Sequence, residues 1–286
     1  MVKFHVSYTK WMFVLPLLIL LVGAIVYPLG ELLMTSFSIG MMGAKLSFGL
    51  TNYKKALIDP FFWNSIRITL IFVITVVSIE FGIGLGIALL TQHLDNQVIK
   101  AVLLFPMMTA PIAVGMVWRL MYHPMFGVIN QMLHFLRIPP QGWLADPKLA
   151  LTSVIISDIW QWSAFIYLVL LAGLQSISKE YYEAAQLDGA TKWQIFKNIT
   201  FPLLRPTVYV ALLFRSMSAF KVFGKFVTLT WGGPGRATEV LAIYIYKTSF
   251  QYLEIGYGAA LAIIATLIII AYNESYTRLF SLRRGR

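Results

Sequence analysis

The sequence predicts an all-α integral membrane protein with six transmembrane helices and one polar element between the fourth and the fifth. Hydrophobic residues make up 58% of the 286 residues and charged residues only 12%, whereas about a quarter of the residues in a soluble domain are charged. The mean hydropathy is +0.74. The apolar residues gather in runs that suit a bilayer, because each crossing of the hydrocarbon core needs about 20 largely apolar residues.

The apolar runs define six predicted spans. The first follows Lys3 and Lys10 and is too long for the core of a cleaved signal peptide, so we predict a signal anchor. The second contains one acid, Glu80, and the sixth has no charged residue between positions 255 and 273. The spans are predicted at residues 11–37, 64–92, 100–122, 149–178, 207–230 and 255–277.

Proline and glycine distinguish two of these spans. Pro106 and Pro111 lie in the third span, and each removes a backbone donor, so the helix is expected to kink or break there. A broken membrane helix lines a cavity or is supported by its neighbours, and the sequence leaves both readings open. Gly82, Gly84 and Gly86 in the second span predict a surface where another helix packs closely.

Charged residues occur inside the fourth and fifth spans. The fourth contains Asp158 between aromatic and amide side chains, and the fifth contains Arg215, Lys221 and Lys225. An ionisable residue in a bilayer is costly unless it faces water or a partner. Asp158 therefore either lines a polar path or pairs with Arg215 or Lys221 as a structural ion pair, and both interpretations stay open.

Six spans place both termini on one side of the membrane, and the basic C-terminal run favours the cytoplasm for that side. The net charge of +11 is scattered between apolar runs, which indicates lipid headgroups as the partner and no nucleic acid. One outward loop contains the turn sequence Gly232-Gly233-Pro234-Gly235, and residues 239–257 after it predict an amphipathic helix.

The polar element covers residues 179–206 and is predicted to dock onto another surface. Residues 180–187 favour a helix that ends at Gly189, because glycine adopts the left-handed cap conformation without cost. A second short helix is expected to start at Thr191, and Pro202 is expected to end the element. The alternative is an ordinary amphipathic loop that lies on the bilayer.

The spacing of residues in this element is specific. The segment reads Glu183-Ala184-Ala185, three residues, Gly189, nine residues, Ile199, one residue and Phe201-Pro202. This pattern resembles the EAA loop of bacterial and archaeal ABC importer permeases. Further segments are similar to the carbohydrate-uptake branch, which includes maltose, trehalose and glycerol-3-phosphate permeases, and they lie at residues 118–130, 171–177, 219–223 and 229–246.

The resemblance implies a type I ABC importer permease fold, with residues 1–286 as one transmembrane permease domain in the cytoplasmic membrane. It implies that residues 179–206 form the EAA loop, which couples the spans to a separate ATPase through Glu183, Ala184, Ala185, Asp188 and Gly189. The implied partners are a second homologous permease, a cytoplasmic ATPase dimer and an extracellular or periplasmic solute-binding protein.

The resemblance also implies a sugar, of di- or oligosaccharide size, as the solute. The implied pathway lies near the middles of the third, fourth and fifth spans, and the candidates are Thr109, Asp158, Trp162, Ser216 and Ser218. The family often has an acid at Ser218 and at Gly224, and a proline at Ser178, so this chain departs from it there. The basic residues of the fifth span leave glycerol-3-phosphate or another sugar derivative as the alternative solute.

The sequence favours a transport subunit over an enzyme. It contains no Gly-x-x-x-x-Gly-Lys-Ser/Thr motif, so no cofactor is expected on this chain, and ATP and Mg are expected on the partner ATPase. There is no cysteine, and the four histidines lack metal-ligand spacing, so no metal site is predicted. The distant alternatives are a membrane-embedded enzyme with Asp158 and Glu80 as catalytic acids, and an ion-coupled carrier.

Overall fold

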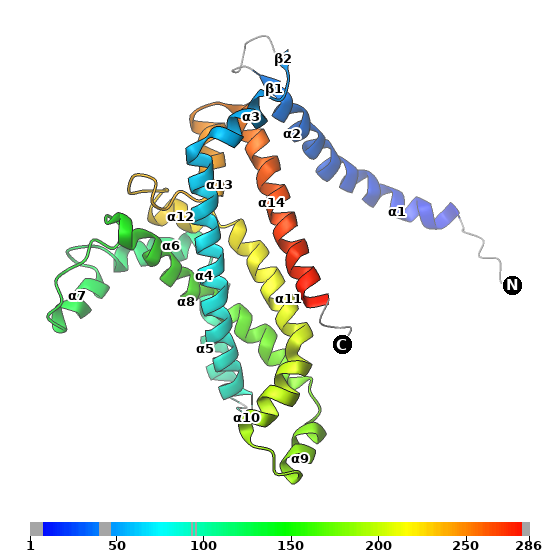
Figure 1. Cartoon of the computed structure of the whole chain (residues 1–286), viewed down its shortest axis with the longest axis vertical. Helices are drawn as coiled ribbons and strands as arrows, with labels where there is room; N and C mark the ends of the chain where they lie inside the picture. Colours follow the sequence, from blue (N-terminus) through cyan, green and yellow to red (C-terminus); the bar gives the residue numbers. More distant parts are fainter. Residues whose placement is uncertain (1–7, 40–46, 93, 95, 282–286) are drawn as a thin grey trace. The chain divides into compact units, whose positions relative to one another are not determined.

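The computed structural model describes residues 8–39, 47–92, 94 and 96–281. The chain is almost entirely helical (Figure 1). It forms two compact units. One unit comprises Met1–Pro60 and Ile245–Ile268, and the other comprises Phe61–Tyr244 and Ile269–Arg286. The predicted site residues all belong to the second unit.

The first unit begins with a continuous helical run, followed by a short antiparallel strand pair and a helix. Asn52 joins these parts, because its side-chain amide donates to the carbonyls of Ser36 at 3.0 Å and Ser38 at 2.7 Å. Lys55 forms an exposed ion pair with Glu254. The elements are α1 (Tyr8–Leu21), η1 (Val22–Val26), α2 (Tyr27–Phe37), β1 (Ser38–Ile39), β2 (Ser47–Phe48), α3 (Thr51–Ile58), η3 (Lys247–Gln251) and the first part of α14 (Ile255–Ser281).

The second unit contains the remaining helices. Its longest helices, α4 and α8, each run for about thirty residues, and both pass as membrane spans by length and apolarity. The elements are α4 (Pro60–Thr91), α5 (Gln97–Met108), α6 (Pro111–Met121), α7 (Val128–Phe135), α8 (Pro147–Gln175), α9 (Lys179–Leu187), α10 (Lys192–Ile195), η2 (Phe196–Thr200), α11 (Phe201–Phe220), α12 (Gly224–Leu229) and α13 (Leu241–Tyr246).

Four helical segments of the described chain are long and apolar enough to cross a membrane, and a bent pair makes a fifth. The bent pair is α5 and α6, which meet at 94°. The break that the prolines predict is therefore present. Thr109 and Ala110 leave the helix with extended backbone, and Ala110 does so because the residue directly before a proline is pushed out of the helical region.

The span predicted over residues 207–230 is divided in the structure. α11 ends at Phe220, and α12 begins only at Gly224 after a non-helical step. The helix upstream is longer than the sequence suggested, since α10, η2 and α11 form one continuous helical run. The prediction that Pro202 ends the polar element is wrong. In the π turn before it, the Phe201 amide donates to the Phe196 carbonyl, five residues back, and the helical run continues through Pro202 directly after this turn.

The prediction of one amphipathic helix over residues 239–257 is also wrong. α13 and η3 occupy the first part, and the chain turns at Tyr252–Glu254 before α14 begins. Leu253 has a φ of 58°, in the left-handed region that interrupts a right-handed helix. The spacing of the apolar residues was compatible with one helix, but the left-handed backbone at Leu253 divides the segment.

Apolar packing fixes the helices of the second unit around two clusters. In one cluster the rings of Phe72 (α4) and Phe226 (α12) meet edge to face, with centroids 5.1 Å apart. In the other, Tyr167 and Leu170 of α8 pack with Leu204 of α11. α8 therefore contributes to both clusters and holds the helices that carry the candidate site.

The glycine run of α4 packs at a single position. A Cβ at Gly84 would lie 2.6 Å from the Ile166 side chain and 2.9 Å from the backbone nitrogen of Tyr167, whereas a Cβ at Gly82 or Gly86 would meet nothing within 4 Å in the described chain. Of these three glycines, Gly84 is the one that lies directly against α8.

Replacing Gly84 with alanine should force α4 and α8 apart, because the added methyl meets backbone. We expect Gly84→Ala to lower the free energy of unfolding by about 1–3 kcal/mol. Gly82→Ala and Gly86→Ala are matched controls on the same helix and should be neutral or slightly stabilising, by about 0.5–1 kcal/mol. Thermal unfolding of the purified chain measures the difference, and equal midpoints for the three variants would contradict the packing.

Candidate functional site

Four charged side chains from four helices meet in the interior of the second unit. We call Glu80 (α4), Asp158 (α8), Arg215 (α11) and Lys225 (α12) the charge cluster. Arg215 donates from Nε to Glu80 Oε2 at 2.5 Å and from Nη2 to Glu80 Oε1 at 2.9 Å, and it also pairs with Asp158 Oδ2. Lys225 Nζ donates to Asp158 Oδ1 at 2.5 Å. Each of the four side chains is at most 2% exposed.

The charge cluster neutralises itself. Its two carboxylates and two cations have a formal sum of zero, and each carboxylate contacts at least one cation. Removing an ion from water costs several kcal/mol, which is recovered only when geometry is good and partners are close. The two-pronged contact of Arg215 with Glu80 meets that condition, because a guanidinium matches a carboxylate with two parallel hydrogen bonds. Trp162 adds its ring 5.3 Å from the Arg215 guanidinium.

The ion-pair interpretation of Asp158 is confirmed for Arg215 and wrong for Lys221. The helix break at positions 221–223 explains the difference. Lys221 ends α11 as its C-cap, whereas Lys225 lies in the first turn of α12 and points back toward α8. The sequence marked Glu80 as an acid inside a span and as a catalytic acid of the alternative enzyme. Its partner Arg215 could not be read from the sequence, because the two residues lie 135 positions apart.

A pocket of about 240 Å³ lies beside the charge cluster. It is formed where both helix breaks meet α8, so Pro111 from the start of α6 and the step between α11 and α12 contribute to its wall. The wall mixes charged, hydroxyl and aromatic side chains. The lining residues are Pro111, Asp158, Trp162, Arg215, Ser218 and residues 221–225.

The structure brings three of the five predicted pathway residues to this pocket, namely Asp158, Trp162 and Ser218. Thr109 lies at the break between α5 and α6, where its carbonyl accepts a 2.7 Å hydrogen bond from the Gln161 side chain. Ser216 is buried, and its hydroxyl donates to the Leu213 carbonyl at 2.9 Å. Thr109 and Ser216 are not among the lining residues.

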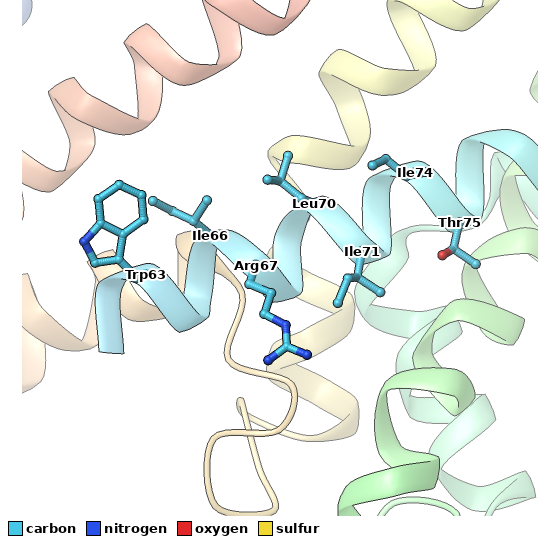
Figure 2. A pocket seen from close by; sticks show the side chains of 7 residues that line it. All are labelled: Trp63, Ile66, Arg67, Leu70, Ile71, Ile74 and Thr75. Carbon is cyan, nitrogen blue, oxygen red and sulfur yellow. The ribbon is translucent and has the colours of Figure 1, made fainter. Parts of the chain in front are cut away.

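A second hollow of about 580 Å³ lies on one face of α4 and contains none of the predicted site residues. Figure 2 shows its lining side chains along this single helix, from Trp63 to Thr75, with Arg67 among mainly apolar neighbours. A hollow on one helix face lacks the convergent polar groups of a solute site. We therefore assign the candidate site to the pocket beside the charge cluster.

The predicted coupling residues form a separate element at the ends of α8 and α11 (Figure 1). α9 is capped by Ser178, whose hydroxyl accepts from the Glu180 amide, and Gly189 follows it with a φ of 72°. α10 starts with a capping box between Thr191 and Gln194. The helix, its glycine stop and the second start at Thr191 lie where the sequence predicts them.

The exposed surface of this element differs from expectation in one respect. Glu183, Ala184, Asp188 and Gly189 are exposed, whereas Ala185 is only 9% exposed and packs inside the chain. Large apolar side chains of this element are exposed as well. They are Leu187 at 90%, Trp193 at 69% and Tyr181 at 56%.

The model of a protein family described as "Binding-protein-dependent transport system inner membrane component" matches residues 78–284. The chain belongs to this family. This permease is 33% identical to the trehalose/maltose transport system permease protein MalF of Thermococcus litoralis over 286 residues, which cover 99% of this chain and 97% of the relative. It is 35% identical to the sulfoquinovosyl glycerol transport system permease protein SmoG of Agrobacterium fabrum over 269 residues, which cover 92% and 87% of the two chains.

A solved structure has the same fold as the permease. It is the crystal structure of a bacterial ABC transporter involved in the import of the acidic polysaccharide alginate, with a TM-score of 0.85, 23% sequence identity and coverage of 98% of this chain and 96% of that one. The predicted all-α importer-permease fold is thereby confirmed. The permease is a multi-pass membrane protein, and the resemblance inferred from the EAA spacing is confirmed.

Removing Arg215 should destabilise the permease, because Glu80 would lose the cation that pairs with it and Asp158 would lose one of its two cationic partners. We expect Arg215→Met to lower the free energy of unfolding by about 3–5 kcal/mol. Arg205→Met changes an exposed arginine of the same helix and should cost less than about 0.5 kcal/mol. Thermal unfolding in lipid nanodiscs measures both.

A second substitution separates this effect from lost packing. Glu80→Gln in the Arg215→Met background removes the carboxylate left unpaired and should recover part of the lost stability. Equal unfolding midpoints for Arg215→Met and Arg205→Met would contradict the stabilising role of the charge cluster.

Proposed function

We propose that this permease is the transmembrane subunit of an ATP-driven importer that passes a sugar, of di- or oligosaccharide size, across the cytoplasmic membrane. The chain would alternate between inward-open and outward-open states, and a separate ATPase would supply the energy. Its relatives include permeases named for trehalose/maltose and for sulfoquinovosyl glycerol. Both names describe sugar transport, which supports the solute class.

The observation that carries this proposal is the geometry of the coupling element. α9 and α10 are short helices with well-formed caps, so they hold their shape without a covering domain. Large apolar side chains are exposed on them, which favours burial against a partner protein. α10 continues through η2 into α11, so a push on this element would reach the helix that carries Arg215.

The assembly follows from this role. The coupling element would face the cytoplasm and contact an ATPase dimer through Glu183, Ala184, Asp188 and Gly189, with Ala185 supporting the helix from inside. Both termini would then also lie in the cytoplasm. A second, homologous permease would complete the transmembrane path, and an extracellular or periplasmic binding protein would deliver the solute. ATP and Mg would bind to the partner ATPase.

The charge cluster argues against the alternative function, a membrane-embedded enzyme. Glu80 and Asp158 were its catalytic acids, yet both carboxylates are engaged by buried cations. A general acid needs access to its substrate. Asp158 reaches the pocket wall only as part of an ion pair, which suits a scaffold for the solute path better than proton transfer.

Changing the coupling element should separate ATP hydrolysis from uptake. Gly189→Val forces a β-branched residue into the left-handed region, which costs about 1–2 kcal/mol and should lower coupled uptake by about fivefold to thirtyfold. Glu183→Lys reverses an exposed charge at the proposed contact and should act in the same direction. The reconstituted complex is assayed for solute uptake and ATP hydrolysis together.

Gly189→Asn is the matched control, because asparagine tolerates the left-handed conformation and should retain coupling. The helices outside the element should keep their thermal stability in all three variants. If both Gly189→Val and Glu183→Lys show normal uptake per ATP hydrolysed, the proposal that this element docks onto the ATPase is contradicted.

The pocket should affect transport kinetics. Trp162→Ala removes an aromatic face and Ser218→Ala a hydroxyl, so each should raise the KM for uptake, by about threefold to tenfold for a lost hydrogen bond of about 1 kcal/mol or more. Ser163→Ala is the control on α8, since its hydroxyl donates to the Ile159 carbonyl and does not line the pocket. Unchanged kinetics in alanine variants of Thr109, Asp158, Trp162, Ser216 and Ser218 would contradict a path through this region.

A further inference from the structure

The three cations around the pocket are not equivalent. Arg215 and Lys225 are buried and their charges are balanced by Glu80 and Asp158. Lys221 also lines the pocket, but its side chain is exposed, and no acidic residue in the described part of the chain pairs with it. The pocket wall therefore carries one cation whose charge is not balanced by any residue that the structure describes.

The position of Lys221 keeps that charge at the pocket. Lys221 is the C-cap of α11, where its backbone amide donates to the Ser218 carbonyl at 3.2 Å. The C-terminal end of a helix carries a partial negative charge, which attracts a cation such as the Lys221 ammonium. The non-helical step that follows presents residues 221–223 to the pocket instead of burying them in a continuing helix.

We propose that Lys221 binds the anionic substituent of an acidic sugar, so that the preferred solute carries a carboxylate, sulfonate or phosphate group on its ring. This rests on the proposed function as a sugar permease and names its substrate class. The contact is a charge-assisted hydrogen bond from the Lys221 ammonium to the anionic oxygen, which is about twice as strong as a neutral one.

The remaining lining residues suit the rest of such a solute. The Trp162 ring offers an apolar face for the C–H surface of a sugar ring, and the Ser218 hydroxyl, three residues before Lys221, offers a donor and an acceptor for sugar hydroxyls. The pocket volume of about 240 Å³ equals the share of roughly eight water molecules in liquid water. That space accommodates one sugar ring with its substituent, so this site would recognise one acidic unit of a solute.

A matched pair of sugars tests the charge preference. Methyl glucuronide and methyl glucoside share one ring and differ only in a carboxylate or a hydroxymethyl group. Binding of each is measured by calorimetry on the assembled transporter in nanodiscs, without binding protein. We expect the glucuronide to bind about tenfold more tightly, and Lys221→Gln to remove that preference while changing glucoside affinity less than about twofold.

Two control variants isolate the charge. Lys221→Arg keeps a cation and should keep the preference for the glucuronide. Lys148→Gln makes the same chemical change at an exposed position on the first turn of α8, outside the pocket, and should leave both affinities unchanged.

Each result gives a decision. A glucuronide preference that is absent from the natural chain, or that persists in Lys221→Gln, overturns the assignment of Lys221. The preference would also be absent if a carboxylate of the second permease formed an ion pair with Lys221, and that result overturns the assignment as well. If only the glucoside binds, the proposed sugar permease stands and the acidic solute is rejected. If neither sugar binds, the result contradicts both the sugar-permease function and the acidic solute.

Discussion

The interaction on which the rest of the second unit depends is the contact of Arg215 with Glu80 and Asp158. It joins α11 to α4 and α8, and Lys225 adds α12 to the same group. Apolar packing places these helices, but packing alone tolerates small shifts. Buried charges do not, because each must remain within hydrogen-bonding distance of a partner or bear the full cost of its burial. The charge cluster therefore fixes how the step between α11 and α12 faces α8, and with it most of the pocket wall.

The sequence predicted features that depend on one or two neighbouring residues. Pro106 and Pro111 predicted the break between α5 and α6, and Gly189 and Thr191 predicted the stop and restart in the polar element. These are local effects of missing donors, positive φ and side-chain caps. The EAA spacing predicted the family in the same way, from a pattern within about 20 residues.

Features that depend on distant segments could not be predicted. The choice of Lys225 over Lys221 as the partner of Asp158 follows from a helix break that no proline or turn motif marks. The close approach at Gly84, and its absence at Gly82 and Gly86, depends on where α8 crosses α4. The continuous helix through Pro202 needed the π turn before it, and hydrophobic periodicity does not distinguish a π turn from an α turn.

The order of the charge cluster along the chain has a consequence for biogenesis. Glu80 is synthesised 135 residues before Arg215. While the ribosome completes the intervening chain, the newly inserted second span holds an acid whose partner does not yet exist. Final assembly of these helices must therefore wait until α11 enters the membrane. A chain truncated before that point would present an unmatched polar group inside the bilayer, a feature by which quality control can recognise unfinished membrane proteins.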